Sequence, residues 1–512
     1  MKKFSPILVC VWGNVVIAVV AAFWLGLYPA WISVGCLLDP ALHDGGAVRY
    51  AFDMHRSLSP KIARWAEGRL QQDRPTQLTR TNISGNEWPL FGSVFYLWAT
   101  EGLPEAWERA PAPGSVAPNV YARDAIAASV RLVLDPTHAT WVKRMWGEHY
   151  LDRHNCFYRF LRIAAMTAQV RLLEDTSILP QLREEVDRLA AEIDGSRAGL
   201  IEDYPGECYP GDVAAALACI CRADAVLGTD HGDMLRRAYR GFDETKTDGL
   251  YRLPPYAAVV HTGFITDGAR GCSNAYYCMT GPELWPEAAA NWYANYDKYF
   301  WQESLLFAGF REFPRGAKDR DWYLDVDAGP CAAGYGAAAS AFGLAAARIN
   351  GRFDHAYPLA AQMITLSWPM PNGRLVFPAI LSNVTDAPFL GEQCILYTLS
   401  RTVQPGVPIT AGGRLPGIVI LIILLYLSCS ALLVLVSVRG ARLAAKRPAR
   451  VPALQTAAWG AATLVSLTFF LSGMMLPALY CLAISQAFPM RLWRRRVRGT
   501  AQSLSRPLEN PD

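Results

Sequence analysis

The chain has 512 residues, of which 52% are hydrophobic and 18% charged, and its formal net charge is +4 at pH 7. Its length allows roughly two to four domains. The apolar composition excludes a purely soluble protein, since the excess is concentrated at the two ends. The positive charge lies largely in basic segments beside those ends, so it does not predict nucleic-acid binding.

The amino-terminal segment, residues 1–38, is predicted to be a membrane anchor. Residues 4–38 carry no charge and follow Lys2 and Lys3, and an apolar run of this length spans a bilayer. A cleaved signal peptide is the alternative. The apolar stretch is too long for one and no small-residue cleavage site follows it, so we expect a retained anchor.

Two apolar regions near the carboxyl end predict further membrane helices. Residues 416–438 form one span, and residues 451–490 fit a hairpin of two short spans broken at Gly473 and Pro477. The loop after the first span and the tail 491–512 are basic, which the positive-inside rule assigns to the cytoplasm. We therefore expect a multi-pass protein of the inner (cytoplasmic) membrane of a bacterium, with the lipid bilayer as a partner and the central domain, residues 39–410, facing the periplasm.

Eight of the twelve cysteines fall in this outward-facing region. The region has neither a C-x-x-C motif nor the Cys/His spacing of a zinc site, so we expect no metal and no cofactor. Most of these cysteines stand among apolar residues and are expected to be buried thiols. Cys272 and Cys278 are a candidate disulfide pair, which spacing alone cannot establish.

Helical patterns recur through residues 50–405 and predict an all-α central domain. Residues 180–193 place four aliphatic side chains on one stripe. Residues 155–173 are apolar nearly all round, and residues 332–349 are rich in glycine and alanine. Outer amphipathic helices that alternate with inner apolar ones predict an (α/α) toroid, with an incomplete or distorted ring as a possible variant, flanked by transmembrane helices. The side chains of the stripe are Leu182, Val186, Leu189 and Ile193.

Carboxylates and aromatic side chains gather in the predicted loops between these helices. Aromatic walls exclude water and raise carboxyl pKa values, as a general acid working near neutral pH requires. The predicted loops are 80–93, 147–155, 201–212, 250–275 and 311–330. The candidate catalytic residues are Asp203, Asp212, Glu207, Tyr204, Glu87 and Asp325. The candidate substrate-binding residues are Trp88, His149, Tyr150, Tyr158 and Arg270.

Several of these residues also have a purely structural explanation. Asp212 directly precedes a helical run, where aspartate is a favoured N-cap, and Glu207 fits a turn cap. His149 and its neighbour His154 fit hydrogen-bonded core histidines. A single carboxylate or histidine in a loop is therefore weak evidence of a site.

Asp325 and Asp327 share one side of an extended segment because their spacing is two residues. They fit a carboxylate pair, and they equally fit salt bridges to Arg315 or Arg320. Five acidic, aromatic loops on one face of a toroid would be stronger evidence, since structural needs alone rarely put so many acids beside tryptophan and tyrosine.

Four segments between residues 140 and 400 resemble the linalool dehydratase/isomerase family. They are "KRMWGEHYLD…HNCFYRF" (143–160), "GLIEDYPGECYPGD…AVLGTDH" (199–231), "RGCSNAYYCMTGPELWP" (270–286) and "AAASAFGLAAARINGR" (337–352). The resemblance implies an (α/α)6 toroid that dehydrates or isomerises a terpene alcohol without a cofactor. The membrane anchors lie outside it.

The chain departs from the family at its catalytic positions. The family places two cysteines nine residues apart on the loop that matches 201–212, where this chain has Asp203 and Asp212 with Cys208 between them. The family's catalytic histidine falls at Leu161 or Arg162, so that role does not transfer. The resemblance therefore implies a similar bowl with different chemical groups on its floor.

The family's early catalytic aspartate has no partner in register, and Glu87 is the nearest acid in the corresponding loop. We expect a membrane-anchored acid/base lyase or isomerase in which Asp203 and Asp212 transfer protons to and from a small hydrophobic alcohol of isoprenoid type. One alternative is a carbohydrate-active enzyme, a glycoside hydrolase or polysaccharide lyase, that acts on an envelope glycan with paired carboxylates. Another is a non-catalytic envelope binding or scaffold protein, and an oligomer is compatible with each.

Overall fold

The computed structural model describes residues 6–79, 81–109, 116–245, 249–318, 320–446 and 453–471, together with Ala478 and Cys481. In this part of the chain the protein is mostly helical and has a few short strands, which confirms the predicted dominance of helices. The chain divides into two compact units, Ser33–Val419 and the combination of Met1–Ile32 with Ile420–Asp512.

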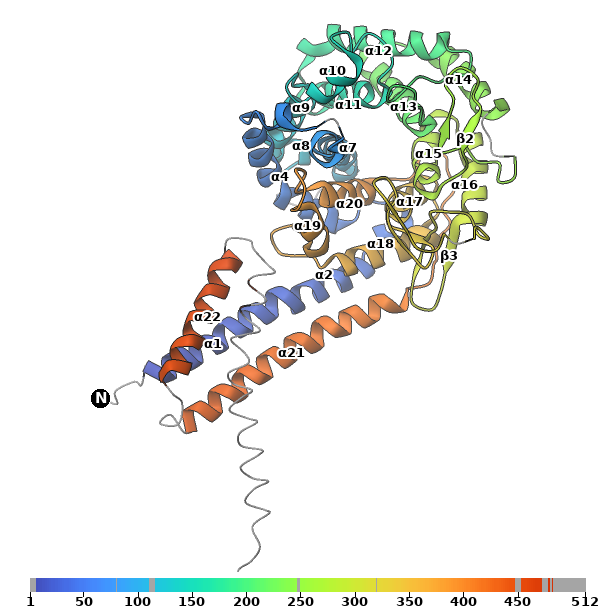
Figure 1. The fold of residues 1–512 in the computed structure, drawn as a ribbon. Helices are drawn as coiled ribbons and strands as arrows, with labels where there is room; N and C mark the ends of the chain where they lie inside the picture. The colour runs from blue at the N-terminus through green and yellow to red at the C-terminus, as the bar shows by residue number, and fades with distance from the viewer. Residues whose placement is uncertain are drawn as a thin grey trace, which may run out of the picture. The chain divides into compact units, whose positions relative to one another are not determined.

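Six of the described helices of the first unit pack against one another in a closed order, and we call them the inner helices. Each contacts the next in the order α7, α11, α13, α15, α17 and α20, and α20 contacts α7 again (Figure 1). Most of their side chains are buried, because they are apolar or small on nearly every side. The inner helices are α7 (Trp88–Arg109), α11 (Cys156–Leu173), α13 (Pro210–Leu227), α15 (Gly271–Leu284), α17 (Ala337–Ile349) and α20 (Leu390–Ser400).

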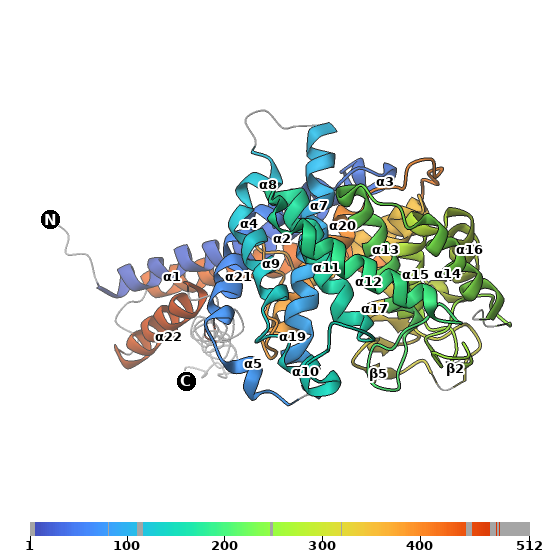
Figure 2. The ribbon, with the colours of Figure 1, turned by 90° about the horizontal axis from the view of Figure 1, so that it is seen from above.

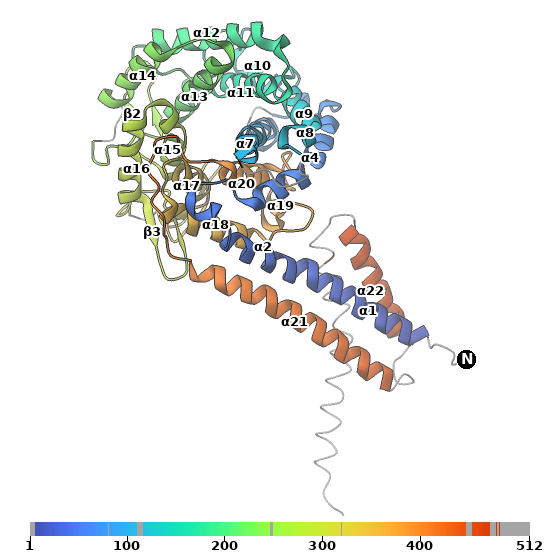
Figure 3. The ribbon, with the colours of Figure 1, turned by 180° about the vertical axis from the view of Figure 1, so that it is seen from behind.

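A second set of helices lies outside the inner ones and alternates with them along the chain (Figure 3). Helix α12 is typical: it has proline in its first turn, buries the predicted aliphatic stripe and packs against α11 and α13. These outer helices are α4 (Arg49–Leu70), α9 (Arg123–Leu134), α12 (Leu179–Gly195), α14 (Gly232–Thr245), α16 (Pro286–Phe300) and α18 (Phe353–Ser367).

Short elements connect the helices, with β2 and β5 on one side of this unit and α3 and α8 on the other (Figure 2). The strands form three small antiparallel sheets, β1–β2, β3–β4 and β5–β6–β7. The short helices are α3 (Ala41–Asp44), α5 (Arg74–Gln77), α6 (Ile83–Asn86), α8 (Pro118–Tyr121), α10 (Thr140–Trp146), η2 (Thr176–Ile178) and α19 (Val376–Ser382). The strands are β1 (Ala257–Ala258), β2 (Ile265–Asp267), β3 (Trp301–Glu303), β4 (Ala308–Phe310), β5 (Tyr323–Asp325), β6 (Gly329–Ala332) and β7 (Tyr335–Gly336).

Four predicted boundaries were wrong by a few residues. The expected loop 250–275 runs into α15, which begins at Gly271. The expected loop 80–93 contains α6 and the start of α7, so Trp88 is a helical residue. The expected helix 332–349 begins only at Ala337, because the backbone before it pairs as β6 and β7. The expected loop 201–212 ends at Pro210, the first residue of α13.

The second unit contains the apolar ends of the chain. The stretches Trp12–Leu37 and Gly417–Arg442 are each 26 residues long, enough by length and composition to cross a membrane. They fall within α1 (Pro6–Ala22), η1 (Phe23–Leu27), α2 (Tyr28–Leu37) and α21 (Gly417–Lys446), and α22 (Ala453–Leu471) follows. The predicted break at 472–477, most of the second half of the hairpin and the tail 491–512 lie outside the described residues.

Small and polar residues join the helices of this second unit. The Ser430 hydroxyl donates a hydrogen bond to the Ala22 carbonyl at 2.9 Å. A Cβ at Gly26 would lie 1.8 Å from Ser430 Oγ, so glycine is required there for α21 to approach. Close packing through glycine and serine is typical of helices that associate in a membrane.

Candidate active site

The segment between α12 and α13 makes a tight turn that sorts its acidic residues into buried and exposed ones. The Glu207 N–H donates to the Tyr204 carbonyl at 2.9 Å, and Gly206 has φ +83°. Proline followed by glycine with positive φ is the sequence of a type II turn. The turn leaves Glu207 exposed, where its carboxylate accepts a hydrogen bond from the Tyr209 hydroxyl at 3.0 Å.

Asp203 is the most deeply buried carboxyl of this segment, at 1% exposure. Its Oδ2 accepts a hydrogen bond from the Tyr209 N–H at 2.7 Å, whereas its Oδ1 is buried and has no hydrogen-bond partner among the described residues. Burial and the neighbouring Asp212 raise the pKa of Asp203 well above its usual range, although the Tyr209 and Phe157 N–H groups and the Cys156 thiol oppose the rise. Burial therefore favours the protonated form of Asp203.

Asp212 lies inside the first turn of α13 and does not cap it. The helix begins at Pro210, and its N-cap is Tyr209, which makes no side-chain cap bond. The alternative explanation of Asp212 as an N-cap was therefore wrong. Loss of bulk water, and then the negative charges of Asp327 and Glu87, raise the pKa of Asp212 to about 8.

Glu87 directly precedes α7 and is 8% exposed. Burial raises its pKa to about 7, and the negative charge of Asp327 adds to the rise. A hydrogen bond with the Tyr204 side chain opposes the rise, because it stabilises the ionised carboxylate. The pKa of Tyr204 is raised well above its usual range by burial and by the charge of Glu87, so Tyr204 remains a hydroxyl donor.

Asp327 was considered only as the partner of Asp325 in a possible carboxylate pair and was not among the candidate catalytic residues. The structure gives the two residues different surroundings. Asp327 is exposed at the surface and accepts a hydrogen bond from the Tyr256 hydroxyl, and the partial loss of water around its carboxyl raises its pKa. The Tyr256 ring contacts the Tyr209 ring with centroids 5.2 Å apart, which links this acid to the loop before α13. Sequence spacing carried no sign of this contact.

Asp325 belongs to an ion-pair cluster and not to the group of acids whose pKa values are raised. It accepts hydrogen bonds from Arg270 at 2.6 Å, from the Tyr323 hydroxyl at 2.8 Å and from the Ala328 N–H at 2.6 Å. Burial would raise the pKa of Asp325, but these donors outweigh it and lower the pKa. The predicted partners Arg315 and Arg320 were wrong, because Arg270 occupies that place.

Arg270 is fully engaged by protein groups, which argues against the substrate-binding role expected for it. Its Nε donates to the buried Glu312 carboxylate at 2.8 Å, and its guanidinium lies 4.1 Å from the centre of the Tyr256 ring. Glu312 also accepts a hydrogen bond from the Cys272 thiol at 3.1 Å. Arg270 therefore fixes the wall of the site.

The cysteines in this region are free thiols. Cys272 and Cys278 both lie on α15 and are not joined, so the candidate disulfide was wrong. Of the eight cysteines in the central region, six are buried and two half-buried, as expected for most of them: Cys156, Cys208, Cys219, Cys272, Cys278 and Cys331, and then Cys221 and Cys394.

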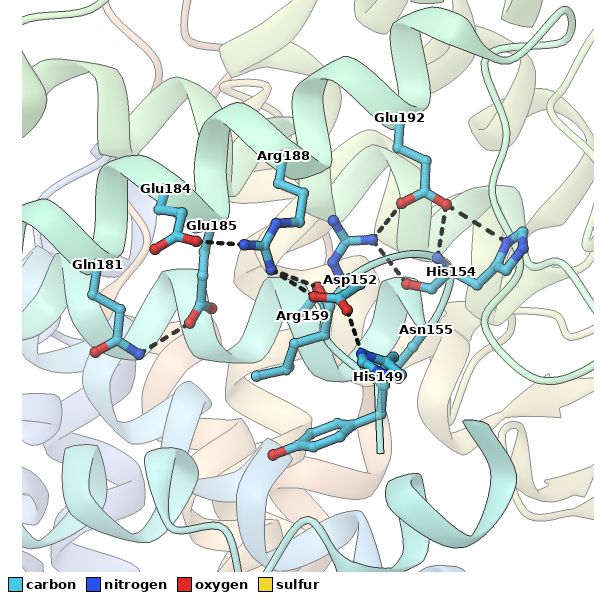
Figure 4. Close-up of polar contacts among 12 residues, drawn as sticks. His149, Asp152, His154, Asn155, Arg159, Gln181, Glu184, Glu185, Arg188 and Glu192 are labelled. Carbon is cyan, nitrogen blue, oxygen red and sulfur yellow. Dashed lines mark hydrogen bonds and ion pairs between the residues drawn. The ribbon is translucent and has the colours of Figure 1, made fainter. Parts of the chain in front are cut away.

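Three of the predicted substrate-binding residues lie away from the acids Asp203, Asp212, Glu87 and Asp327. His149 is on the surface, with a side chain 89% exposed, and it bonds Asp152 at 2.9 Å in the network drawn in Figure 4. Tyr158 is fully buried and donates to the Val133 carbonyl at 3.1 Å, and the buried Tyr150 ring packs beside it at 6.1 Å. The alternative explanation of His149 as a hydrogen-bonded core histidine was also wrong, because its side chain lies on the surface.

Trp88 is the predicted substrate-binding residue that stays beside the acids, as the half-buried neighbour of Glu87. His154 is also half-buried, and its ring lies 3.6 Å from Glu192, which receives the His154 N–H at 2.7 Å (Figure 4). Within the described residues, no group of three or more His, Cys, Asp or Glu side chains could hold a metal ion.

The structure thus brings Asp203, Tyr204, Asp212 and Glu87 together with Asp327 at one end of the inner helices, where α7, α11 and α13 begin. No family model matches the chain. A search of curated proteins also finds no match. What the site can do is therefore argued from its geometry: it holds several carboxyl groups whose pKa values are raised toward neutrality, together with a tyrosine hydroxyl, and such a set can donate and accept protons at neutral pH.

Proposed function

We propose that the unit Ser33–Val419 is an (α/α)6 toroid with an acid/base site at the N-terminal end of its inner helices. The closed order of inner-helix contacts and the alternation with outer helices support the toroid. The observation that carries the function is the set of carboxyls with raised pKa values, above all Asp212 at about 8 and Glu87 at about 7. Carboxyl groups with separated pKa values can take acid and base roles in one reaction.

The reaction we propose is the elimination of water from a small alcohol, or its allylic isomerisation. Asp212, protonated near neutral pH, donates its proton to the substrate hydroxyl as the C–O bond breaks and water leaves. Glu87, ionised above about pH 7, accepts a proton from the neighbouring carbon, and that C–H electron pair forms the double bond. Tyr204 holds the Glu87 carboxylate, and Asp203 keeps a second proton behind Asp212.

The depth of the acids favours a small substrate over an envelope glycan. Asp203 and Glu87 are 1% and 8% exposed, whereas a polysaccharide needs an open groove in which two carboxyls flank the chain. Aromatic rings beside the acids, among them Trp141 at 6.4 Å from Tyr204, suit an apolar molecule. This agrees with the resemblance to linalool dehydratase/isomerase, with carboxyls in place of cysteines.

We also propose that Trp12–Leu37 and Gly417–Arg442 cross the inner membrane of a bacterium and that the toroid faces the periplasm. Their length and apolar composition support the crossing, and the basic loop 439–450 supports the orientation. A substrate of isoprenoid type would then arrive from the bilayer.

The test is turnover by the full chain in detergent, with monoterpene and sesquiterpene tertiary alcohols as one arm and envelope glycans as the other. We expect alkene and water from an alcohol, loss of turnover in Asp212→Asn, and wild-type turnover in the surface control His149→Ala. Cleavage of a glycan by wild type but not by Asp212→Asn would replace our proposal with the carbohydrate reading. Absence of turnover in both arms, from protein that unfolds cooperatively, would favour the non-catalytic alternative.

A further inference from the structure

One face of the sheet β5–β6–β7 exposes apolar side chains. Leu324 pairs with Pro330 across β5 and β6, and Ala332 pairs with Tyr335 across β6 and β7. Residues that pair directly, and residues two apart along a strand, point to the same side of a sheet. Leu324 is 75% exposed, Pro330 and Ala332 are also exposed, and Trp322, directly before β5, is 76% exposed. We call Leu324, Pro330 and Ala332, with Trp322 at their end, the apolar sheet face.

The opposite face of the same sheet is turned toward the proposed active site. Asp325 accepts hydrogen bonds from Arg270 and from the Tyr323 hydroxyl, and Cys331 of β6 is buried. An antiparallel sheet with one solvated face normally places apolar residues inside and polar residues outside. In β5 the order is inverted, with the carboxylate inside and the leucine outside. The outer face is therefore unsuited to water.

The tip of the β3–β4 hairpin, residues 304–307, lies on the same side of this sheet as the apolar sheet face. The Tyr335 hydroxyl donates to the Phe307 carbonyl at 3.2 Å, and the two rings lie 6.0 Å apart. The tip adds two apolar side chains to the surface, Leu305 at 71% and Leu306 at 40% exposure. Neighbouring strands lie about 4.8 Å apart, which puts β5 about 10 Å from β7 and the tip.

The hairpin tip is bonded directly to the first residues of a stretch long and apolar enough to cross a membrane, Gly417–Arg442. The Gly417 N–H donates to the Leu305 carbonyl at 3.0 Å, and the Ile418 N–H donates to the Leu306 carbonyl at 3.1 Å. A Cβ at Gly417 would lie 2.9 Å from the Leu305 carbonyl oxygen, so this approach requires glycine. Where Gly417–Arg442 enters a bilayer, the hairpin tip therefore lies at the surface of that bilayer.

We propose that the apolar sheet face and the hairpin tip contact the lipid bilayer that Gly417–Arg442 enters, so that the wall of the acid site backs onto the membrane. This inference rests on the membrane crossing proposed above. Trp322 and Tyr335 are of the aromatic types that gather where acyl chains meet headgroups. Lys318, exposed a few residues before Trp322, suits the anionic phosphates of those headgroups.

Photo-cross-linking of the full chain tests this in nanodiscs of palmitoyl-oleoyl phosphatidylethanolamine and phosphatidylglycerol. p-Benzoylphenylalanine replaces one residue at a time, and mass spectrometry measures the yield of lipid adducts. Leu424, 53% exposed within the membrane stretch, is the positive control. Val120 is the matched negative control, because it is 60% exposed and α8 lies on the other side of the unit from β5 (Figure 2). We expect yields at Leu324 and Leu305 about tenfold above that at Val120 and comparable to that at Leu424.

The outcomes separate this inference from the membrane crossing on which it rests. Adducts at Leu424, with a yield at Leu324 or Leu305 no higher than at Val120, would overturn the membrane contact and leave the crossing intact. Absence of lipid adducts at Leu424 would overturn the crossing and the contact together. Cross-links from Leu324 to a second copy of the chain in place of lipid would overturn the proposal in favour of an interface between copies.

Discussion

Carboxyl groups at the two ends of the inner helices have their pKa values shifted in opposite directions. At the N-terminal end, burial and the charges of Asp327 and Glu87 raise the pKa of Asp212 to about 8. At the C-terminal end, burial also acts on Glu283, but Arg222 and Arg401 outweigh it and lower the pKa to about 2. Because burial is common to both, the nearby cations decide whether a carboxyl is kept as an acid or as an ion.

The placement of the cations follows the direction of the inner helices. The C-terminal end of a helix favours positive charge: Arg171 stands in the last turn of α11 and Arg401 directly after α20, while Arg222 stands one turn before the last turn of α13. At the other end, Arg270 is bonded by Glu312 and Asp325. The acids nearest the start of α13 thus repel one another, which keeps protons on them.

Asp212→Asn should have the largest effect of the variants we predict, because it removes the proposed general acid at the N-terminal end of the inner helices. Removal of a general acid lowers turnover by about 10²- to 10⁴-fold, which initial rates on the best alcohol substrate would measure. The fold should not suffer. Since the folded pKa of about 8 lies above the ordinary 3.8, protonation of Asp212 stabilises the fold fully below about pH 3.8, and this contribution is lost as pH rises through 8.

Relative to wild type, the Asp212→Asn protein should therefore gain stability between pH 4 and pH 8, measured as the change in unfolding temperature. A variant that loses turnover and unfolds at a much lower temperature at every pH would show that Asp212 is a structural residue.

Glu283→Gln should lower the stability of the protein by removing the carboxylate of the ion-paired cluster at the C-terminal end of the inner helices. The change leaves Arg222 and Arg401 buried without their carboxylate, and loss of one partner of a buried pair destabilises by about 3–5 kcal/mol. Since the folded pKa of about 2 lies below the ordinary 4.5, this contribution is fully present above pH 4.5 and is lost as pH falls through 2. Denaturant unfolding at pH 7 and at pH 3 measures it, and an equal difference at both would contradict the assignment.

Tyr204→Phe should change the pH profile of turnover, which tests whether Glu87 is the base at the N-terminal end of the inner helices. With a base of pKa about 7 and an acid of pKa about 8, kcat/KM should pass through a maximum between these values. The Tyr204 hydrogen bond lowers the pKa of Glu87, so its loss should move the acidic limb to higher pH and leave the basic limb in place. An unmoved acidic limb would remove Glu87 from the base role.

Asp327→Asn should move both limbs. Asp327 is the charged neighbour that contributes most to the raised pKa of Asp212, and it also raises the pKa of Glu87, so its neutralisation should lower both pKa values and shift both limbs of kcat/KM to lower pH. Asp325→Asn is the matched comparison at the same strand end, and we expect lower stability from it because Arg270 loses a partner. Identical effects of the two variants would contradict the assignment of Asp327 to the electrostatics of Asp212 and of Asp325 to the ion pair with Arg270.

Composition and periodicity predicted two of the inner helices, α11 and α17, and one outer helix, α12, because burial repeats along them. The buried stripe of α12, from Leu182 to Ile193, and the all-round burial of α11 are consequences of local spacing. Boundaries were less predictable, because the residues directly before α17 pair as β6 and β7 although they continue the glycine- and alanine-rich pattern of the helix.

The site was predictable in part. The loop 201–212 and Glu87 were identified from carboxylates beside aromatic residues, and the structure brings them together. Which of Asp325 and Asp327 has its pKa lowered depends on whether Arg270, more than fifty residues away in sequence, bonds to it. His149 is exposed although it stands in an acidic, aromatic loop, because Asp152 and Arg188 hold that loop against the outer helix α12.

His149→Ala should have the smallest effect of these variants. It tests whether the proposed site extends to the loop 147–155. Its imidazole is 89% exposed and bonds only the half-exposed Asp152 among the described residues, and exposed ion pairs of this kind contribute about 0–1 kcal/mol. We expect an unfolding free energy within about 0.5 kcal/mol of wild type and an unaltered pH profile. A tenfold loss of turnover with unaltered stability would show that the acidic face includes the loop 147–155 and that the acids at the start of α7 and α13 are only part of the site.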